Sequence, residues 1–436
     1  MKHDASRTIR AIQWLTFFLA DVQTGLGPFL AAYLAANGWN PARVGYALTF
    51  GGLVTVATQT PAGAIIDAAH HKRLLVAVSL SVLVIGAVLL MGHLSFIEVY
   101  AAQFLIGGAG AFLAPAVAAI TLGVVGAASF DRLFGKIQGF NSAGNVATAL
   151  LVACISYHFG YRMIFAATAL LAIPAAIALS QIDPKKIDYA RARGGAGDQT
   201  RVTNESFSLL SRDRVLLAFL AAVFLFHAAN AAMLPELGEL LSKDNPKAAG
   251  PFMSACVIVT QLVISLSAAW IGKRAATHGR KHLLLIGFGI LPIRGVLYTL
   301  THATSLLIAI QLLDGVANAI FVIVSILVIK DRTAGTGRFN VAAGALATMV
   351  GIGASVSNTI GGILIQRFSF RVSFLGLSAL AVCAFALLWM TIPETLPTKS
   401  SEMLPPGSGS RLHVHFAQSD SIARPPQLDP NRGGQA

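Results

Sequence analysis

Long apolar stretches recur along the whole chain and are separated by short polar segments. Most are about 20 residues long, the length that an α-helix needs to cross the hydrocarbon core of a bilayer. Because helices satisfy their own backbone hydrogen bonds in lipid, the pattern predicts an all-α membrane protein. The first stretch contains Asp21 and precedes no small-residue cleavage site, so it is expected to be retained. The predicted spans are 11–35, 43–66, 74–92, 97–125, 139–159, 163–182, 215–241, 250–271, 283–300, 304–329, 341–365 and 372–393.

The composition agrees with this pattern, since 55% of the 436 residues are hydrophobic and only 12% are charged. The net charge of +13 would suggest nucleic acid as a partner of a soluble protein. Here, most Lys and Arg residues lie in the N-terminal segment, in alternate loops and in the tail. This bias predicts a multi-pass protein of the inner (plasma) membrane with both termini in the cytoplasm, and no nucleic-acid partner. The exceptions are Arg43, Arg162, Lys243, Lys247, Arg367 and Arg371 in the opposite loops, and Arg294 within a span.

The three cysteines lie far apart, in separate apolar spans. Small packing residues are the expected role, and neither a disulfide nor a metal site is predicted. No cofactor is expected. The cysteines are Cys154, Cys256 and Cys383.

Short motifs repeat at an offset of roughly 200 residues, which indicates a duplicated six-helix unit. The predicted parts are an N-terminal half (1–182), a cytoplasmic linker (183–214), a C-terminal half (215–393) and a disordered cytoplasmic tail (394–436), because the tail is rich in Pro, Gly and Ser. The repeated motifs are Asp131-Arg132 with Asp331-Arg332, Phe140-Asn141 with Phe339-Asn340, Gln103 and Gly107 with Gln311 and Gly315, and Pro28 with Pro235.

The loop after the second span has Gly63, then Asp67 four residues on, then the basic pair Lys72-Arg73. This resembles the signature of the major facilitator superfamily, and the loop after the eighth span keeps its Gly-Arg-Lys end with Ala276 in place of the acid. The resemblance implies twelve transmembrane helices in two parallel six-helix repeats around a central cavity, and a cytoplasmic gate at these loops. The gate residues are Gly63, Asp67, Lys72, Arg73, Asp131, Arg132, Gly279, Arg280, Lys281, Asp331 and Arg332.

The segment from Phe18 to Leu30 is also similar to a bacterial subgroup of that superfamily, whose substrates the resemblance does not name. Such a likeness indicates the fold more directly than it indicates the substrate.

Ionisable residues inside the spans are costly in hydrocarbon and are therefore functional candidates. Asp21 lies near the middle of the first span, where it could bind a proton, pair with a cation, or form a structural hydrogen bond to a neighbouring helix. Arg294 and Asp314 lie at similar depth on adjacent spans, so an ion pair is expected, either a switch or a structural tie. His227 could relay protons, or be a packed hydrogen-bonding residue.

Amide side chains within the spans could line a polar cavity or bind helices together. Glu236 and Glu239, near the end of the seventh span, are expected to be solvated rim charges rather than ligands. The cavity-lining candidates are Gln59, Gln103, Asn145, Asn230, Gln261, Gln311 and Asn318.

The predicted function is secondary transport of a small solute by a monomer, with proton-coupled export first and proton-coupled uptake as the alternative. A non-transporting sensor on the same scaffold stays open. An ATP-driven pump lacks its phosphate-binding loop. An enzyme is not expected, because His70-His71 is followed by Leu75 where membrane acyltransferases carry an acid, and no catalytic residues are assigned.

Overall fold

A computed structural model describes residues 2–24, 26–188, 192, 213–333 and 339–395. Residues 1–396 form one compact unit. Every regular element in the described residues is helical, which confirms the all-α prediction. Most of the predicted linker and the tail from residue 396 onward lie outside the described residues.

The helices follow the predicted spans closely, with a short 3₁₀ helix η1 (Pro184–Lys186) after the first seven. The first seven are α1 (Lys2–Thr24), α2 (Leu26–Ala36), α3 (Pro41–Ala68), α4 (Lys72–Leu89), α5 (Phe96–Val125), α6 (Ala127–Phe159) and α7 (Arg162–Ser180). The remainder are α9 (Arg214–Asn230), α10 (Met233–Asp244), α11 (Pro246–His278), α12 (Arg280–Tyr298), α13 (Thr304–Thr333), α14 (Phe339–Arg367) and α15 (Phe370–Thr391).

Ten segments of the described chain are long and apolar enough to cross a membrane, the α9–α10 pair counting as one. The predicted spans 11–35 and 43–66 correspond to α1 with α2 and to α3, which are not among the ten. α3 packs against both α5 and α14, and a helix that neighbouring helices surround does not need an apolar surface all round.

The first span of the predicted C-terminal half is divided into two helices. α9 ends at Asn230 and α10 begins at Met233. Pro235 is the third residue of the helix after the division. Proline lacks the N–H that would bond to the preceding turn, so it fits the first turn of a new helix and not the middle of a continuous one.

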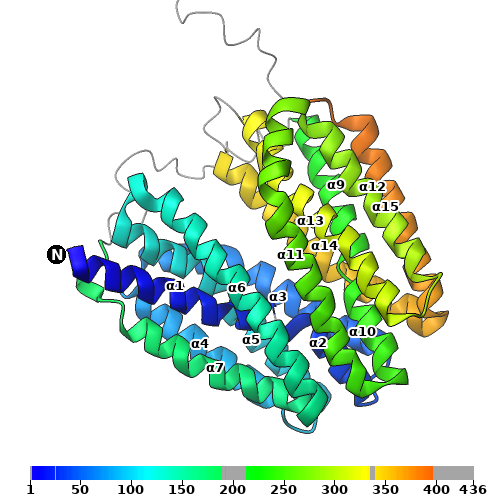
Figure 1. Ribbon diagram of the computed structural model, residues 1–436, viewed down its shortest axis with the longest axis horizontal. Helices are drawn as coiled ribbons and strands as arrows, with labels where there is room; N and C mark the ends of the chain where they lie inside the picture. Colours follow the sequence, from blue (N-terminus) through cyan, green and yellow to red (C-terminus); the bar gives the residue numbers. More distant parts are fainter. Residues whose placement is uncertain (1, 25, 189–191, 193–212, 334–338, 396–436) are drawn as a thin grey trace, which may run out of the picture. The chain divides into compact units, whose positions relative to one another are not determined.

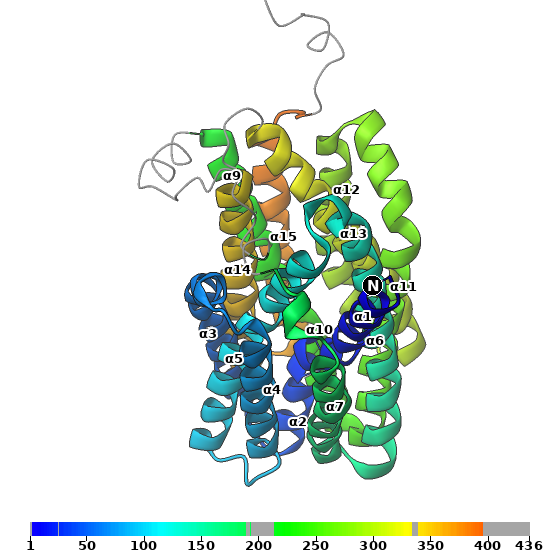
Figure 2. The same cartoon turned by 90° about the vertical axis from the view of Figure 1, so that its left-hand side faces the viewer.

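Helices from the two predicted halves meet at one end of the unit. α2 packs against α10, and the first part of α3 packs against the last part of α14 (Figures 1 and 2). The Thr49 hydroxyl donates to the carbonyl oxygen of Ser355 at 2.5 Å, and the Ala42 N–H donates to Oε1 of Gln366 at 3.2 Å. We call this end, where α2 meets α10 and residues 41–56 meet 351–366, the closed end.

Glycines permit this approach of α3 to α14. A Cβ on Gly45 would overlap the carbonyl oxygen of Asn358, and one on Gly362 would overlap that of Pro41. The two backbones are therefore in direct contact, which is the packing that small residues allow between membrane helices.

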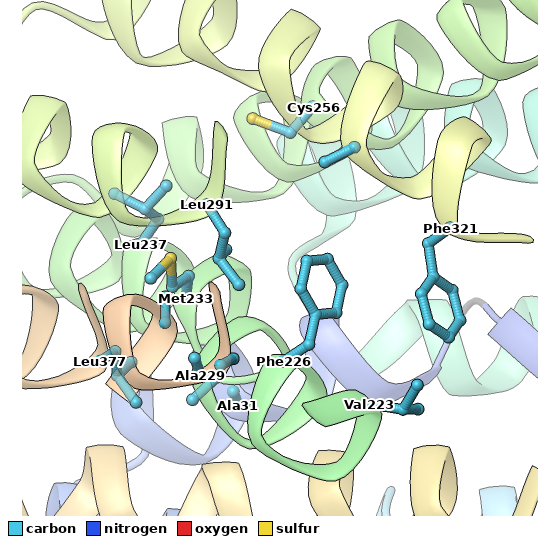
Figure 3. Packing of buried hydrophobic residues seen from close by; sticks show 14 of the residues in the cluster. Ala31, Val223, Phe226, Ala229, Met233, Leu237, Cys256, Leu291, Phe321 and Leu377 are labelled. Atoms are coloured by element: carbon cyan, nitrogen blue, oxygen red, sulfur yellow. The ribbon is translucent and has the colours of Figure 1, made fainter. Parts of the chain in front are cut away.

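The larger hydrophobic core lies among α9 to α15 and continues into α2 at the closed end. Phe226 packs against Phe288, with ring centroids 4.5 Å apart. It also packs against Phe321, with ring centroids 5.4 Å apart (Figure 3). Ala31 of α2 belongs to the same buried cluster as Ala229 and, on α10, Leu237. A second cluster fills the space among α1, α4, α5, α6 and α7.

Candidate functional site

A buried ion pair lies in the predicted C-terminal half, between Arg294 of α12 and Asp314 of α13. The two residues are 2% and 9% exposed. The structure thus brings together the two charges that the sequence places at similar depth. Taking each charge out of water costs several kcal/mol, so the pair persists only if further hydrogen bonds satisfy the remaining donors and acceptors.

Those bonds come from three other helices. Nη2 of Arg294 donates to Oδ1 of Asn230 at 2.6 Å and lies 3.2 Å from the sulfur of Met233. The Thr260 hydroxyl, on α11, donates to Oδ2 of Asp314 at 3.3 Å. Asn230 ends α9 and Met233 begins α10, so the guanidinium is bound at the division between these two helices.

Further polar groups extend the site along α12 and α13. The Tyr298 hydroxyl donates to Oε1 of Gln311 at 2.5 Å, and the Arg294 guanidinium lies 5.7 Å from the centroid of the Tyr298 ring. Nε of Arg294 and Nε2 of Gln311 are buried without a hydrogen-bond partner of good geometry, and the Gln311 side chain interacts with the thiol of Cys256. The Arg294 donor is therefore unsatisfied within the polar network. We call Asn230, Thr260, Arg294, Tyr298, Gln311 and Asp314 the polar network.

His227 lies outside the polar network, although it is on the same helix as Asn230. Its ring makes an edge contact with Phe321 at 4.6 Å between centroids, and its Nε2 is buried with no partner. The side chain of Asp21 lies outside the described side chains.

Some of the amide candidates line cavities, and others are buried where helices pack. Gln59 lines a cavity of about 430 Å³ among α1, α3, α5 and α6, and Gln261 lines one of about 510 Å³ between α6 and α11. Gln103 is buried and donates to the carbonyl oxygen of Ala47 at 2.9 Å, which ties α5 to α3. Asn145 is buried on α6, and Asn318 is half-buried on α13.

The prediction that Glu236 and Glu239 are solvated rim charges is wrong. They are 2% and 3% exposed. Their position near the end of a span indicated contact with water, but α2, α11, α14 and α15 all pack against α10 and cover that face.

Charged residues at the opposite end from the closed end link α12, α13 and the residues after α15. Nε of Arg280 lies 3.0 Å from Oδ2 of Asp331. The carboxylate of Glu394 accepts hydrogen bonds from the backbone N–H of Arg280 at 2.7 Å and of Lys281 at 3.1 Å. A carboxylate at a helix N-terminus satisfies free N–H donors and is favoured by the helix dipole. Glu394 is therefore the carboxylate that meets the N-terminus of α12.

Glycine is required beside this carboxylate. Gly279 has φ +99°, and a Cβ there would overlap the carboxylate of Glu394. Sequence reasoning placed Glu394 at the start of the tail and missed this role.

The other gate candidates are placed as follows. Lys72 is fully buried and its ammonium donates to the carbonyl oxygen of Ile66, while Arg73 donates to that of Ser180 at 3.2 Å. Gly63 faces open space. The side chains of Asp67, Asp131 and Arg132 lie outside the described side chains.

Arg332 of α13 is bound to Asp213, which caps α9. The guanidinium is 2.6 Å from Oδ2, and Oδ1 accepts from the N–H of Val215 at 3.0 Å. Burial raises the pKa of Asp213, but hydrogen bonds from Arg332 and the helix N–H groups outweigh it and leave the pKa below its ordinary value. The pair therefore stabilises the fold above the unfolded pKa, and this stabilisation is lost as the pH falls through the folded pKa.

We expect Arg332→Gln to destabilise the protein by about 1 kcal/mol or less at neutral pH, because the pair is partly exposed to solvent. The difference from wild type should shrink as the pH falls below about 4, the ordinary range of an aspartate. Thermal unfolding in detergent at neutral and acid pH measures this, with Lys330→Gln, an exposed cation on the same helix, as the control. A difference that is independent of pH would contradict it.

The bundle of apolar helices and the buried polar network define a polytopic membrane protein of the transporter class. The sequence model of the Major Facilitator Superfamily matches residues 14–277 and 245–409. An uncharacterised MFS-type transporter of Mycobacterium tuberculosis (strain ATCC 25618 / H37Rv) is 38% identical over 393 residues, which is 89% of this chain and 94% of that protein. The chain therefore belongs to the major facilitator superfamily.

More distant likenesses agree with this family. The multidrug resistance protein MdtG of Erwinia billingiae is 29% identical over 165 residues, covering 36% of this chain and 39% of MdtG. The crystal structure of the nucleoside transporter NupG superposes with a TM-score of 0.73 and 15% identity over 89% of this chain and 98% of NupG. This second likeness shows the fold. As a member of the major facilitator superfamily, the protein is a secondary transporter of small-molecule substrates.

Proposed function

We propose that this protein exports a small organic or amphipathic compound in exchange for protons, by alternating access and as a monomer. The observation that carries the proposal is the buried Arg294–Asp314 pair at the division between α9 and α10. Burying a charged pair inside a membrane span costs free energy, whereas a purely structural contact between helices can form without that cost. The resemblance of part of the chain to a multidrug resistance protein favours export over uptake.

In this proposal the polar network binds the solute or responds to it. The N–H groups at Nε of Arg294 and Nε2 of Gln311 would donate hydrogen bonds to an oxygen atom of the solute. The ion pair between Asp314 and Arg294 would then weaken. Because Arg294 also binds Asn230 and Met233, a change in the ion pair would alter how α10 continues from α9. Ligands shift a conformational equilibrium only through such differences in affinity between the two states.

The distribution of basic residues supports an orientation. Most lie in the segments that the positive-inside bias assigns to one side, which include the Arg280–Asp331 and Arg332–Asp213 pairs of the described residues. We place this side in the cytoplasm together with both termini. The closed end then faces outside, and the conformation described here is closed to the outside. The predicted halves 1–182 and 215–393 would rock about the bound solute, with 183–214 as their linker.

The test is flux in proteoliposomes of purified protein, driven by a pH gradient and measured with a broad panel of organic solutes. Wild type is expected to move at least one solute faster with the gradient than without it. Asp21→Asn is run in parallel, since a carboxyl in that span is the first coupling candidate, and its loss should abolish gradient-driven flux. Glu98→Gln, a capping residue of α5, is the matched control with unchanged flux.

Three outcomes would revise the proposal. Gradient-driven uptake into vesicles of known orientation would replace export with uptake. Flux that Asp21→Asn leaves unchanged would move the coupling role to another carboxyl. Solute binding without flux would favour a sensor.

A further inference from the structure

Glu236 lies on α10 at the place where this helix meets α14 and α15. Its Oε1 accepts a hydrogen bond from the Ser373 hydroxyl at 2.9 Å, and its Oε2 is buried with no partner. A Cβ on Gly361 of α14 would overlap this carboxyl group, so glycine at that position leaves the space that the carboxyl occupies. The Glu236 carboxyl group thus accepts a hydrogen bond from one hydroxyl group, and no cation among the described residues pairs with it.

Glu239 lies one turn further along α10, and its Oε2 is also buried with no partner. The nearest cation along the helix is Lys243, one turn on, but this side chain is exposed and its ammonium lies 5.0 Å from the centroid of the Phe370 ring. Two carboxyl groups three residues apart share one face of a helix, so each disfavours a negative charge on the other.

The other ionisable groups around α10 do not neutralise this pair. Arg294 of α12, which touches Met233 at the start of α10, is bound to Asp314. The hydroxyl of Tyr33 on α2 donates to the carbonyl oxygen of Leu90. On α11, Cys256 is buried and uncharged as a thiol. The exposed cations at the ends of the packed helices are Lys247 of α11, Arg367 of α14 and Arg371 of α15, and the side chain of Asp244 lies outside the described side chains.

We propose that Glu236 and Glu239 form a proton-binding site that is occupied when the closed end is closed and empty when that end opens. An ionised carboxylate without a cation or a full set of donors costs several kcal/mol to bury, and two adjacent ones cost more. The neutral acids remove that cost. Closure of α10 against α2 and α15 is therefore linked to the binding of protons, and opening hydrates the pair and releases them.

This inference rests on the proposed function only in that the closed end faces outside. The pair exchanges its protons with the outside when that end opens, so these protons are distinct from those that drive export, and the pair lies at a place other than the polar network. The closed end includes the α2–α10 contact, so opening that end removes α2 from the four helices that cover α10, which are α2, α11, α14 and α15. The two acids are coupled by their proximity and are expected to titrate as a unit rather than singly.

The first test is infrared difference spectroscopy of the purified protein in detergent as a function of pH. Wild type should show the carbonyl band of protonated carboxylic acids at neutral pH, where a glutamate in water, with a pKa of about 4.3, is ionised. Glu236→Gln and Glu239→Gln should each remove part of that band, and the double variant should remove more than either. Glu98→Gln should leave the band unchanged. A band that the double variant leaves intact overturns the proposal.

The second test measures the opening of the closed end. Spin labels at His93→Cys and His302→Cys, exposed positions in loops before α5 and α13, report the distance between the two halves in a variant in which Cys154, Cys256 and Cys383 are replaced by alanine. Raising the pH should shift wild type toward longer distances. The Gln double variant, which is neutral at every pH, should keep the short distance throughout.

The two tests separate this inference from the proposed function. Loss of the band in the Gln variants, together with a label distance that does not depend on pH in wild type, overturns the link between proton binding and closure even if flux is driven by a pH gradient. A band and a label distance that respond as expected, in a protein whose flux ignores the gradient, uphold the site and overturn proton-coupled export. Monodisperse elution and the thermal midpoint of each variant verify that the Gln substitutions preserve the fold.

Discussion

Asp314→Ala is expected to abolish solute flux and to destabilise the protein by about 3–5 kcal/mol, because it leaves Arg294 buried without its counter-ion. The remaining partners of the guanidinium, Asn230 and the sulfur of Met233, carry no charge and cannot replace the carboxylate. Thermal unfolding in detergent and flux in proteoliposomes measure the two effects on the same preparation.

The double variant Arg294→Met with Asp314→Leu distinguishes a working pair from a structural tie. Replacing both members of a buried ion pair with apolar residues of similar volume is commonly neutral or stabilising, so the thermal midpoint should recover. Flux should stay lost, since no charge remains to bind a solute or to respond to one. Recovery of flux along with stability would mean that the pair serves only to hold α12 against α13.

Gly45→Ala is expected to prevent α3 from reaching α14 and to reduce flux sharply. The added Cβ would overlap the carbonyl oxygen of Asn358, which is backbone and cannot rotate away. Overpacking of this kind costs about 1–3 kcal/mol. If this cost falls only on the closed conformation, it changes the equilibrium between closed and open forms by about 5- to 150-fold.

The label distance between His93→Cys and His302→Cys, in the cysteine-free background, reports that shift directly. Gly110→Ala is the control, because a Cβ at this helical position meets no atom within 4 Å. Unchanged distances and flux in Gly45→Ala would show that the approach of α3 to α14 is not part of the transport cycle.

Part of the site could be predicted because charged residues are rare within apolar stretches of the chain. Arg294 and Asp314 are charges in apolar stretches, and their equal depth on adjacent spans was enough to pair them. Thr260 and Tyr298 gave no such signal, since hydroxyl groups are common in membrane helices. Their role depends on the angle at which α11 and α12 face α13, which no local pattern encodes.

The positions of two acids were misjudged, and the contact of a third was missed. Glu236 and Glu239 stand near the end of a span, so hydropathy assigns them to water. Glu394, just after the last span, is exposed as its position indicates, but its contact with α12 was not predicted. In the fold, α14 and α15 cover Glu236, and the N-terminus of α12 receives Glu394. The partners are more than a hundred residues away in the chain.

The sequence by itself determined that this is an all-α membrane protein, and it predicted which segments span the bilayer and on which side the basic residues gather. These properties follow from the free energy of transferring about 20 consecutive residues into lipid, which is a sum over neighbours in the chain. Only the tertiary structure decided which polar groups are buried, which of them are paired and where the two halves touch, because burial and pairing depend on residues that meet only when the helices pack.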